Sequence, residues 1–434
     1  MRVLMVSAVY PPEPVVSSRT SAQIAEALLG EGHEVTVVCP FPSRPAGEGY
    51  PGFRRRWVHC ENGSDGVKVV RCFSFYSRSS TLWSRFLENC SFGLSAGWVV
   101  LTGRRPDVIY SNAWPIFATG LVALVARLRG VPLVLSVQDV YPESLVSQGR
   151  IREGGVLARR MRWVDRGIAR RSRTLIVLSE RWAGLYQNGR EVPSSRISVI
   201  PNWFEGGAID HLVGQAPGRA LMGIPGDAFV LAYGGNVGVA AGVETVIEAF
   251  SLLKEKRNLY LVIAGEGSRL EACRERAKQI DPKRILFRSP WPQEETSLIL
   301  GSADILVLPT QGRQSLASVP SKLVAYMLAE RPVLALAEEE SDLAEVIRRA
   351  GCGWVVPPDQ PQRLADRIRE VIRSPYSDLK VRGSAGRVFA LARFTSEACL
   401  TRVVELLENA ILPCDNDNGM MDEEVEVRLG TLKE

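Results

Sequence analysis

The chain has 434 residues, of which 46% are hydrophobic and 23% are charged, as is usual for a globular protein with a large core. The net charge of +5 is too small to indicate nucleic acid by itself. Eight cysteines are scattered along the chain and only three histidines are present, which argues against a zinc site. We expect buried thiols in a reducing compartment, no bound metal and no cofactor.

The first part of the chain alternates apolar strand patterns with helical patterns. We expect strands at residues 2–9, 34–39, 67–73, 107–110, 132–137, 174–178 and 197–201. Helices are expected after Ser17-Ser18-Arg19-Thr20 and at residues 82–101, 116–128 and 156–171, with a long loop at 40–66. The apolar segment at the N-terminus, MRVLMVSAVY, is too short for a signal peptide. The uncharged stretch 108–126 is interrupted by Pro115, so no membrane-spanning segment is expected.

The second part repeats the alternation with shorter loops. Its expected strands are residues 229–233, 259–264, 285–287, 305–308, 332–336 and 354–356. Strands that alternate with helices predict a parallel sheet, so the fold class is α/β with two doubly wound, Rossmann-like domains facing across a cleft. The predicted division is an N-terminal domain at 1–205, a C-terminal domain at 206–393, a helix at 394–412 that crosses back, and an acidic, disordered tail at 413–434. Residues 206–228, rich in Gly, Ala and Pro, are expected to form the interdomain connection.

A glycine-rich loop opens the second domain. Residues 230–246 read VLAYGGNVGVAAGVETV, which is a strand, a loop containing Gly235, Asn236 and Gly238, and the start of a helix. Glycines permit close backbone approach, and a helix N-terminus offers free N–H groups to an anion. The loop therefore predicts a diphosphate site. A tight turn that binds nothing is the alternative, because short glycine motifs are common.

Short motifs recur along almost the whole chain to about residue 410. They are YPPE at 10–13, GHEV at 32–35, RPDVI at 105–109, QDVYPES at 138–144, IPN at 200–202, YGGN at 233–236, IAGEG at 263–267, AD at 303–304, Pro309 and VPSK at 319–322. In this order the chain resembles retaining glycosyltransferases of the GT-B fold, family 4, in the branch that builds bacterial surface polysaccharides. The resemblance implies a UDP-linked sugar donor on the C-terminal domain, an acceptor on the N-terminal domain, no bound metal, and hexosyl or N-acetylhexosaminyl transfer.

On the donor side, the resemblance places Gly235, Asn236 and Gly238 against the diphosphate. Lys322 and Arg288 are the expected cations for the phosphate charge. Lys322 has a plain alternative, a solvated lysine in a first helical turn. Backbone or hydroxyl groups are expected to reach the donor from Ser318, Val319, Pro320 and Ser321. Pro290 is expected to face the uracil ring.

The donor side also departs from the family pattern. Asn236 and Ala241 stand where relatives often carry an arginine and a lysine, and Ser318 and Ala325 stand where most relatives carry paired glutamates. Donor contacts, above all those to the ribose, must therefore differ from the usual ones.

On the acceptor side, Gln138 and Asp139 follow a strand at the place where relatives often carry a histidine. They are expected to contact the donor sugar or orient the acceptor, and capping of a turn is the alternative for Asp139. The remaining acceptor-side candidates are Glu143, Ser17, Ser18 and Arg19.

A basic helical stretch raises the question of a membrane. Residues 152–173 contain eight arginines beside an apolar stripe, and residues 83–98 add exposed-looking apolar side chains. A basic amphipathic helix suits an anionic membrane surface. A solvated helix packed on its own sheet is the alternative.

Together these features predict a glycosyltransferase that moves a sugar, with retention, to a glycan or a polyprenyl-diphosphate-linked acceptor. We expect it in the cytoplasm, peripheral to the inner face of the cell membrane, with no nucleic-acid partner. Two rivals stand beside it: a UDP-sugar 2-epimerase on the same fold, and a noncatalytic nucleotide-sugar-binding or scaffold protein.

Overall fold

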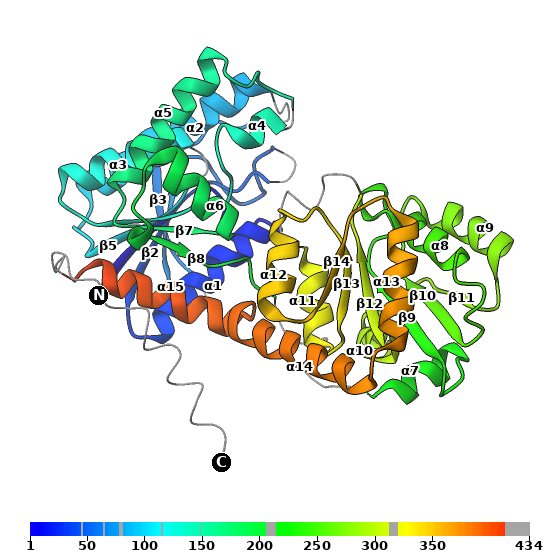
Figure 1. Cartoon of the computed structure of the whole chain (residues 1–434). Coiled ribbons are helices and arrows are strands. Elements are labelled where there is room, and N and C mark those ends of the chain that lie inside the picture. Colours follow the sequence, from blue (N-terminus) through cyan, green and yellow to red (C-terminus); the bar gives the residue numbers. More distant parts are fainter. Residues whose placement is uncertain are drawn as a thin grey trace.

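Two α/β domains are joined by a pair of long helices in the computed structural model (Figure 1). The structure describes residues 1–44, 47–63, 66–77, 81–113, 116–147, 149–204, 214–311 and 320–412. The C-terminal tail after residue 412 and the predicted contacts Ser318 and Val319 lie outside these residues.

The N-terminal domain is built on an eight-stranded sheet in the order β3-β4-β2-β1-β5-β6-β7-β8. Its strands are β1 (Arg2–Val6), β2 (Glu34–Pro40), β3 (Val58–Asn62), β4 (Lys68–Cys72), β5 (Val108–Asn112), β6 (Leu133–Ser136), β7 (Thr174–Val177) and β8 (Ile197–Val199). All neighbours pair in parallel except β3 and β4. The strand residues are apolar on both faces because helices cover both sides of the sheet.

Two helical layers cover this sheet. One face is covered by α2 (Leu82–Thr102), α3 (Ile116–Leu128) and α5 (Val156–Arg171), and the other by α1 (Val16–Gly30) and α15 (Ser396–Ala410). Short helices α4 (Glu143–Ser147) and α6 (Glu180–Gly184) and a π-helical turn at Leu185–Gly189 complete the domain. Glycines let the outer helices approach closely: a Cβ on Gly93 of α2 would lie 2.7 Å from the Cα of Ala118 in α3.

The C-terminal domain has a six-stranded parallel sheet in the order β11-β10-β9-β12-β13-β14. Its strands are β9 (Phe229–Gly234), β10 (Leu259–Ala264), β11 (Ile285–Arg288), β12 (Ile305–Pro309), β13 (Val333–Leu336) and β14 (Gly353–Val356). Its helices are α7 (Gln215–Met222), α8 (Val243–Ser251), α9 (Leu270–Ile280), α10 (Thr296–Ser302), α11 (Ser321–Leu328), α12 (Asp342–Ala350), α13 (Pro361–Arg373) and α14 (Tyr376–Arg393).

The chain returns to the N-terminal domain through its last two helices. Helix α14 ends at Arg393, and the Thr395 hydroxyl accepts a hydrogen bond from the N–H of Ala398 (3.3 Å) to begin α15. Cys399, Val403 and Leu407 of α15 are buried in the N-terminal core. In the described chain, no helix is long and apolar enough to cross a membrane.

Three sequence expectations were wrong. The loop expected at 40–66 contains β3, an edge strand whose half-exposed residues VHCEN lack an apolar run. The connection expected at 206–228 contains α7, where a Cβ on Gly218 would meet the Leu298 carbonyl oxygen at 2.0 Å. The first strand ends at Val6, three residues early, and the Ser7 hydroxyl then donates to the Val9 carbonyl (2.7 Å) in the following loop.

Candidate active site

The ends of four neighbouring strands gather most of the predicted donor-side residues. Strands β9, β10, β11 and β12 are parallel, so their carboxyl ends meet at one edge of the sheet. There Gly235 donates its N–H to the Ala264 carbonyl (2.9 Å), and Gly265 donates to the Arg288 carbonyl (3.0 Å). Three consecutive βα loops are thereby tied together at the edge that faces the N-terminal domain (Figure 1).

Glycine is required at this edge. Gly235 has a φ of 144°, and a Cβ there would lie 2.2 Å from Cε of Lys322. Gly265 has a φ of 135°, and a Cβ there would lie 2.0 Å from the Gly235 carbonyl oxygen. Any side chain would force the loops apart, so only glycine allows the two loops and Lys322 to pack this closely at the strand ends.

Lys322 lies directly against the glycine loop. Its Nζ donates to the hydroxyl of Tyr233 and, at 3.3 Å, to the carbonyl of Asn236, and it lies 4.6 Å from the centroid of the Tyr233 ring. Burial lowers the pKa of Lys322 to about 8. No carboxylate of the described residues forms an ion pair with it. A half-buried ammonium group that has no carboxylate partner and lies beside the exposed residue Asn236 is suited to hold an anion.

Two tyrosines that the sequence did not single out support this arrangement. The Tyr233 hydroxyl donates to the Asn236 carbonyl (2.6 Å). The Tyr326 hydroxyl accepts from the N–H of Gly234 (2.9 Å) and donates to its carbonyl (3.1 Å). Tyr326 lies four residues, about one turn, after Lys322 in α11. This spacing is the sequence pattern from which Tyr326 could have been predicted to lie beside the site.

Arg288 is at the same edge but already has a partner. Its Nε lies 2.7 Å from Oε2 of Glu295, and its Nη2 contacts the other carboxylate oxygen. This hydrogen bond raises the pKa of Arg288 and lowers that of Glu295. Pro290 follows through a cis peptide bond, and the ring of Trp291 covers Gly234. Arg288 would have to exchange Glu295 for a phosphate in order to act as predicted.

The helix after β12 places two more predicted residues. Pro320 precedes the first residue of α11, Ser321, which is exposed. A Cβ on Gly238 would lie 3.4 Å from Nδ2 of Asn236. Gly235, Asn236, Gly238 and Lys322 are therefore brought together at one place.

Across the interdomain space, the carboxyl ends of β1 and β6 place the acceptor-side candidates. Ser17, Ser18 and Arg19 lie in the first turn of α1. Ser18 is buried, and its hydroxyl finds no partner among the described residues. Gln138 donates to the Ser136 hydroxyl (3.0 Å) just after β6.

Asp139 follows Gln138 and carries the free carboxylate of this group. Its surface is exposed, yet the surrounding protein displaces water from the carboxylate and raises its pKa. Among the described residues no ion pair to Asp139 is present. It can therefore accept a hydroxyl hydrogen bond from a ligand.

Glu143 has a structural partner. Its carboxylate lies 2.6 Å from Nη2 of the buried Arg190 and 3.3 Å from Nη2 of Arg162. Burial opposes its ionisation, but the hydrogen bond and charge of Arg190 outweigh that effect and lower its pKa. Arg190 also binds Asp165 (2.9 Å) and the Tyr141 carbonyl (2.9 Å). Glu143 thus anchors the loop that presents Gln138 and Asp139, and contact with an acceptor stays a prediction.

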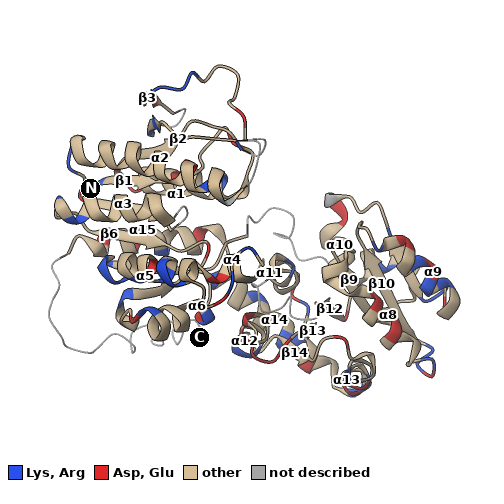
Figure 2. Cartoon of the chain, turned by 90° about the horizontal axis from the view of Figure 1, so that it is seen from above, with Lys and Arg blue, Asp and Glu red and all other residues tan. Residues whose placement is uncertain are grey.

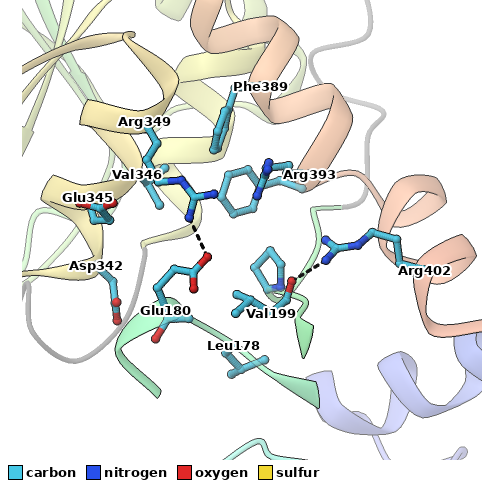
Figure 3. A pocket seen from close by; sticks show the side chains of 13 residues that line it. Leu178, Glu180, Val199, Asp342, Glu345, Val346, Arg349, Phe389, Arg393 and Arg402 are labelled. Carbon is cyan, nitrogen blue, oxygen red and sulfur yellow. Dashed lines mark hydrogen bonds and ion pairs between the residues drawn. The ribbon is translucent and has the colours of Figure 1, made fainter. Parts of the chain in front are cut away.

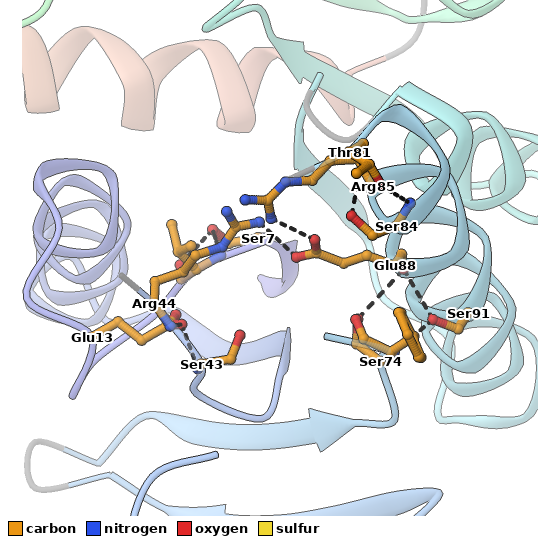
Figure 4. Close-up of polar contacts among 12 residues, drawn as sticks. Ser7, Glu13, Ser43, Arg44, Ser74, Thr81, Ser84, Arg85, Glu88 and Ser91 are labelled. Atoms are coloured by element: carbon orange, nitrogen blue, oxygen red, sulfur yellow. Dashed lines mark hydrogen bonds and ion pairs between the residues drawn. The ribbon is translucent and has the colours of Figure 1, made fainter. Parts of the chain in front are cut away.

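A second polar cluster lies at the ends of β1 and β2 (Figure 4). Buried Glu13 accepts backbone N–H groups of Tyr10 (3.3 Å), Ser43 (2.9 Å) and Arg44 (2.8 Å), and burial raises its pKa. Arg44 and Arg85 each lie 2.6 Å from one oxygen of Glu88. No periodic pattern in the sequence predicts this cluster, because its members come from three separate segments.

The domains also touch through a pocket that contains none of the predicted site residues (Figure 3). Arg349 of α12 reaches across to Glu180 of α6 (2.6 Å), and Arg402 of α15 donates to the Val199 carbonyl (2.8 Å). Phe389 and Phe394 form apolar walls. Of these contacts, the ion pair between Arg349 and Glu180 links the two domains.

Comparison with known proteins agrees with this arrangement. A family model described as a glycosyl transferase 4-like domain matches residues 17–203, and one described as glycosyl transferases group 1 matches residues 219–387. WbjE of Pseudomonas aeruginosa, assigned as a glycosyltransferase, is 28% identical over 71% of this chain and 77% of its own length. WcaI of Escherichia coli K12, assigned as a colanic acid biosynthesis glycosyl transferase, is 25% identical over 89% of this chain and 96% of its own.

Among solved structures, that of Anabaena HepE in complex with UDP superposes with a TM-score of 0.61 and 15% identity, covering 94% of this chain and all of that one (100%). Two facing Rossmann-like domains with a glycine loop on the second define the GT-B class. The chain belongs to the glycosyltransferases of the GT-B fold and is an enzyme that transfers hexosyl groups.

Proposed function

We propose that the protein is a retaining glycosyltransferase of family 4 that uses a nucleoside-diphosphate sugar, UDP-linked, as its donor. The observation that carries the proposal is the Lys322 ammonium group, which has no carboxylate partner in the described chain and packs against the Gly235–Asn236 loop. A diphosphate is the leaving group that such a cation and such a loop stabilise. The UDP complex of the similar HepE structure supports the choice of nucleotide.

Transfer in this site relies on the chain's own charges. As the bond from the sugar to the diphosphate breaks, negative charge on the leaving oxygens is met by Lys322 and by loop N–H groups. The acceptor hydroxyl attacks from the face that the diphosphate leaves and passes its proton to the departing phosphate oxygen, which retains the configuration at the sugar. Gln138 and Asp139, on the facing edge, are proposed to hold sugar hydroxyls. Among the described residues, no cluster of three or more His, Cys, Asp or Glu is arranged to hold a metal ion.

The proposed acceptor is a glycan or a lipid-linked sugar in the assembly of a cell-surface polysaccharide or glycolipid. The assignment of the similar WcaI to colanic acid biosynthesis supports this class. We place the enzyme in the cytoplasm, peripheral to the inner face of the cell membrane, where lipid-linked acceptors are found.

The two rival functions make different predictions about the site. An epimerase needs acid–base groups over the sugar, but His33 lies far from the strand edges, paired with Glu408 (3.0 Å) and the N-terminus. A scaffold protein would bind a nucleotide sugar without turnover, and the observation in its favour is the pairing of Arg288, a predicted phosphate cation, with Glu295.

The test is a thermal-shift screen of the purified chain against UDP-, GDP-, dTDP- and ADP-sugars, each with and without EDTA. The proposal expects a shift with one UDP-sugar that EDTA does not remove. That sugar is then used to measure UDP release with candidate acceptors, and stabilisation by a ligand follows its affinity. No shift with any nucleotide sugar overturns the donor assignment, and binding without UDP release or sugar transfer favours the scaffold function.

A further inference from the structure

The outer helical layer of the N-terminal domain exposes an unusual number of large apolar side chains. We call this surface, formed by α2, α3 and α5, the outer face. Its exposed apolar residues are Trp83, Phe86, Leu94, Trp98, Leu101, Leu124, Leu128, Val156, Leu157 and Trp163. An apolar area of this extent on a protein in water marks a surface that binds something else.

Helix α2 contributes an uninterrupted apolar stripe. Leu94, Trp98 and Leu101 recur at intervals of three or four residues and are 58%, 53% and 48% exposed. After Glu88 the helix carries no charged residue up to its end at Thr102. Figure 2 shows α2 and α3 almost free of charged residues, in contrast to the coloured helices of the other domain.

Helix α3 continues the same surface rather than covering it. Gly93 brings α2 close to Ala118, and a Cβ on Gly120 of α3 would lie 3.5 Å from Ile168 of α5, so the three helices pack side by side. Leu124 and Leu128 of α3 remain 54% and 72% exposed. The apolar area is therefore contiguous across the layer.

Helix α5 adds positive charge beside this apolar area. Trp163 is 77% exposed, and Arg159 and Arg160 form no ion pair with a carboxylate of the described chain. Arg166 and Arg170 share Glu191. Exposed tryptophan and leucine flanked by uncompensated arginines match the two layers of a lipid surface, acyl chains and anionic headgroups.

We propose that the outer face docks on an anionic lipid bilayer, with the apolar side chains of α2 and α3 inserted at the headgroup level and Arg159 and Arg160 on the headgroups. The inference rests on the proposed function for its biological setting, whereas docking itself requires no sugar transfer. A second copy of the chain would cover the apolar stripe but would repel the arginines, so the charge pattern favours the bilayer.

The docked orientation also explains how a lipid-linked acceptor reaches the site. Helices α2, α3 and α5 follow the carboxyl ends of β4, β5 and β6, so their first turns lie at the edge that faces the other domain. There Trp83 stacks on Phe86 (centroids 5.5 Å apart), and Phe86 meets Phe117 edge-on (5.4 Å). The outer face thus runs up to the acceptor side, and the bilayer would lie alongside it.

The experiment is flotation of the full chain with vesicles of phosphatidylcholine alone or of equal parts of phosphatidylcholine and phosphatidylglycerol. We expect the wild type to float with the anionic vesicles and to be released by high salt. Leu94→Glu combined with Trp98→Glu should lower the bound fraction by about tenfold or more, because charges replace inserted apolar groups. Leu391→Glu, at an exposed leucine of α14 in the other domain, is the matched control and should bind like the wild type.

The charge contribution is tested with Arg159→Glu combined with Arg160→Glu. This pair should abolish the preference for anionic vesicles, whereas Lys254→Glu combined with Arg257→Glu, which changes the charge equally on the C-terminal domain, should not. Equal binding of the wild type to neutral vesicles, no flotation at all, or unchanged binding of the α2 variant would overturn the proposal. Light scattering is run in parallel: a dimer that the α2 variant dissociates, with vesicle binding unchanged, would assign the face to a second copy.

Failure of docking and failure of the proposed function can be told apart. Donor binding is measured by thermal shift without vesicles, and the α2 and α5 variants should keep the shift of the wild type. A chain that binds a UDP-sugar but no vesicle refutes the docking alone. A chain that floats but binds no nucleotide sugar refutes the donor assignment alone.

Discussion

The outer helices of the two domains pack on their sheets in the same way, but their outward surfaces differ, charged in one domain and apolar in the other. Both domains lay helices on a parallel sheet, but α9 and α13 of the C-terminal domain carry ion pairs one turn apart, such as Arg274–Glu271 (2.8 Å) and Arg367–Glu370 (2.6 Å). Helices α2 and α3 of the N-terminal domain instead present leucine and tryptophan. Because the buried faces are alike, the difference reflects what each outer surface meets, water in one case and, as proposed, lipid in the other.

The interiors of the domains, in contrast, resemble each other. Each contains a buried arginine bound to a buried aspartate, Arg190–Asp165 (2.9 Å) and Arg219–Asp304 (2.8 Å). Both arginines also bind backbone carbonyls, so each ties a loop or helix to its sheet. The comparison separates what the fold needs in both domains from what only one surface needs.

The largest effect is expected from the buried pairs, which should matter equally in both domains. Arg190→Met and Arg219→Met should each lower the free energy of unfolding by about 3–5 kcal/mol, because each leaves a buried carboxylate without its partner. Denaturant titration measures the loss. Adding Asp165→Leu to Arg190→Met should restore part of the lost unfolding free energy. A loss below about 1 kcal/mol in only one of the two arginine variants would contradict the similar roles of the two buried pairs.

The next effect concerns the donor site of the C-terminal domain. Lys322→Ala should lower the transfer rate by about 100-fold or more, because the leaving diphosphate loses its cation. Lys322→Arg keeps the charge and should retain more of the rate. Initial rates with the UDP-sugar found in the screen measure both variants, and an unchanged rate in Lys322→Ala would contradict the assigned role.

The same lysine predicts a pH dependence. With a pKa of about 8, the Lys322 ammonium is charged below that pH and loses its proton above it. The value of kcat/KM for the donor should therefore fall as the pH rises through about 8. The fall should be absent in Lys322→Arg, whose guanidinium stays charged, and a fall of the same size in that variant would assign it to another group.

A smaller effect tests how the outer face is held together. Gly93→Ala places a Cβ 2.7 Å from the Ala118 Cα and should cost about 1–3 kcal/mol of unfolding free energy through overpacking. Gly97→Ala in the same helix meets only Val125 at 3.8 Å, so it should be neutral or stabilising. Thermal unfolding compares the midpoint temperatures of the two variants. Equal midpoints would show that α2 moves to accommodate the added methyl group without loss of stability.

The smallest stability effects should sharpen the contrast between the two surfaces. Arg367→Ala on α13 and Leu124→Glu on α3 should each change the unfolding free energy by no more than about 0.5 kcal/mol, since both side chains lie at the surface. Only Leu124→Glu should weaken binding to anionic vesicles, because it places a negative charge on the outer face. Equal vesicle binding by the two variants would remove the distinction between the surfaces.

Local pattern predicted much of the fold. The bounds of α3 and α5 and of strand β10 agree with the expected ranges, because each has a clear helical or apolar-run signal between breaking residues. Strand β3 and helix α7 were missed, since an exposed edge strand and a glycine-containing helix lack such signals. In the candidate site, the sequence predicted Gly235, Asn236, Gly238 and Lys322, and the structure brings these residues together, but their roles stay predictions.

The sequence by itself determined the alternation of strands and helices, the glycine loop after β9 and the apolar stripe of α2, because these depend on residues close together in the chain. Only the tertiary structure decided the partners. It placed the Lys322 ammonium group against Tyr233 and Asn236. It paired Arg288 with Glu295 and Glu143 with Arg190. It also joined α2, α3 and α5 into one surface. The physical reason is that hydrogen bonds and ion pairs depend on distance in space, which the period of a sequence does not encode.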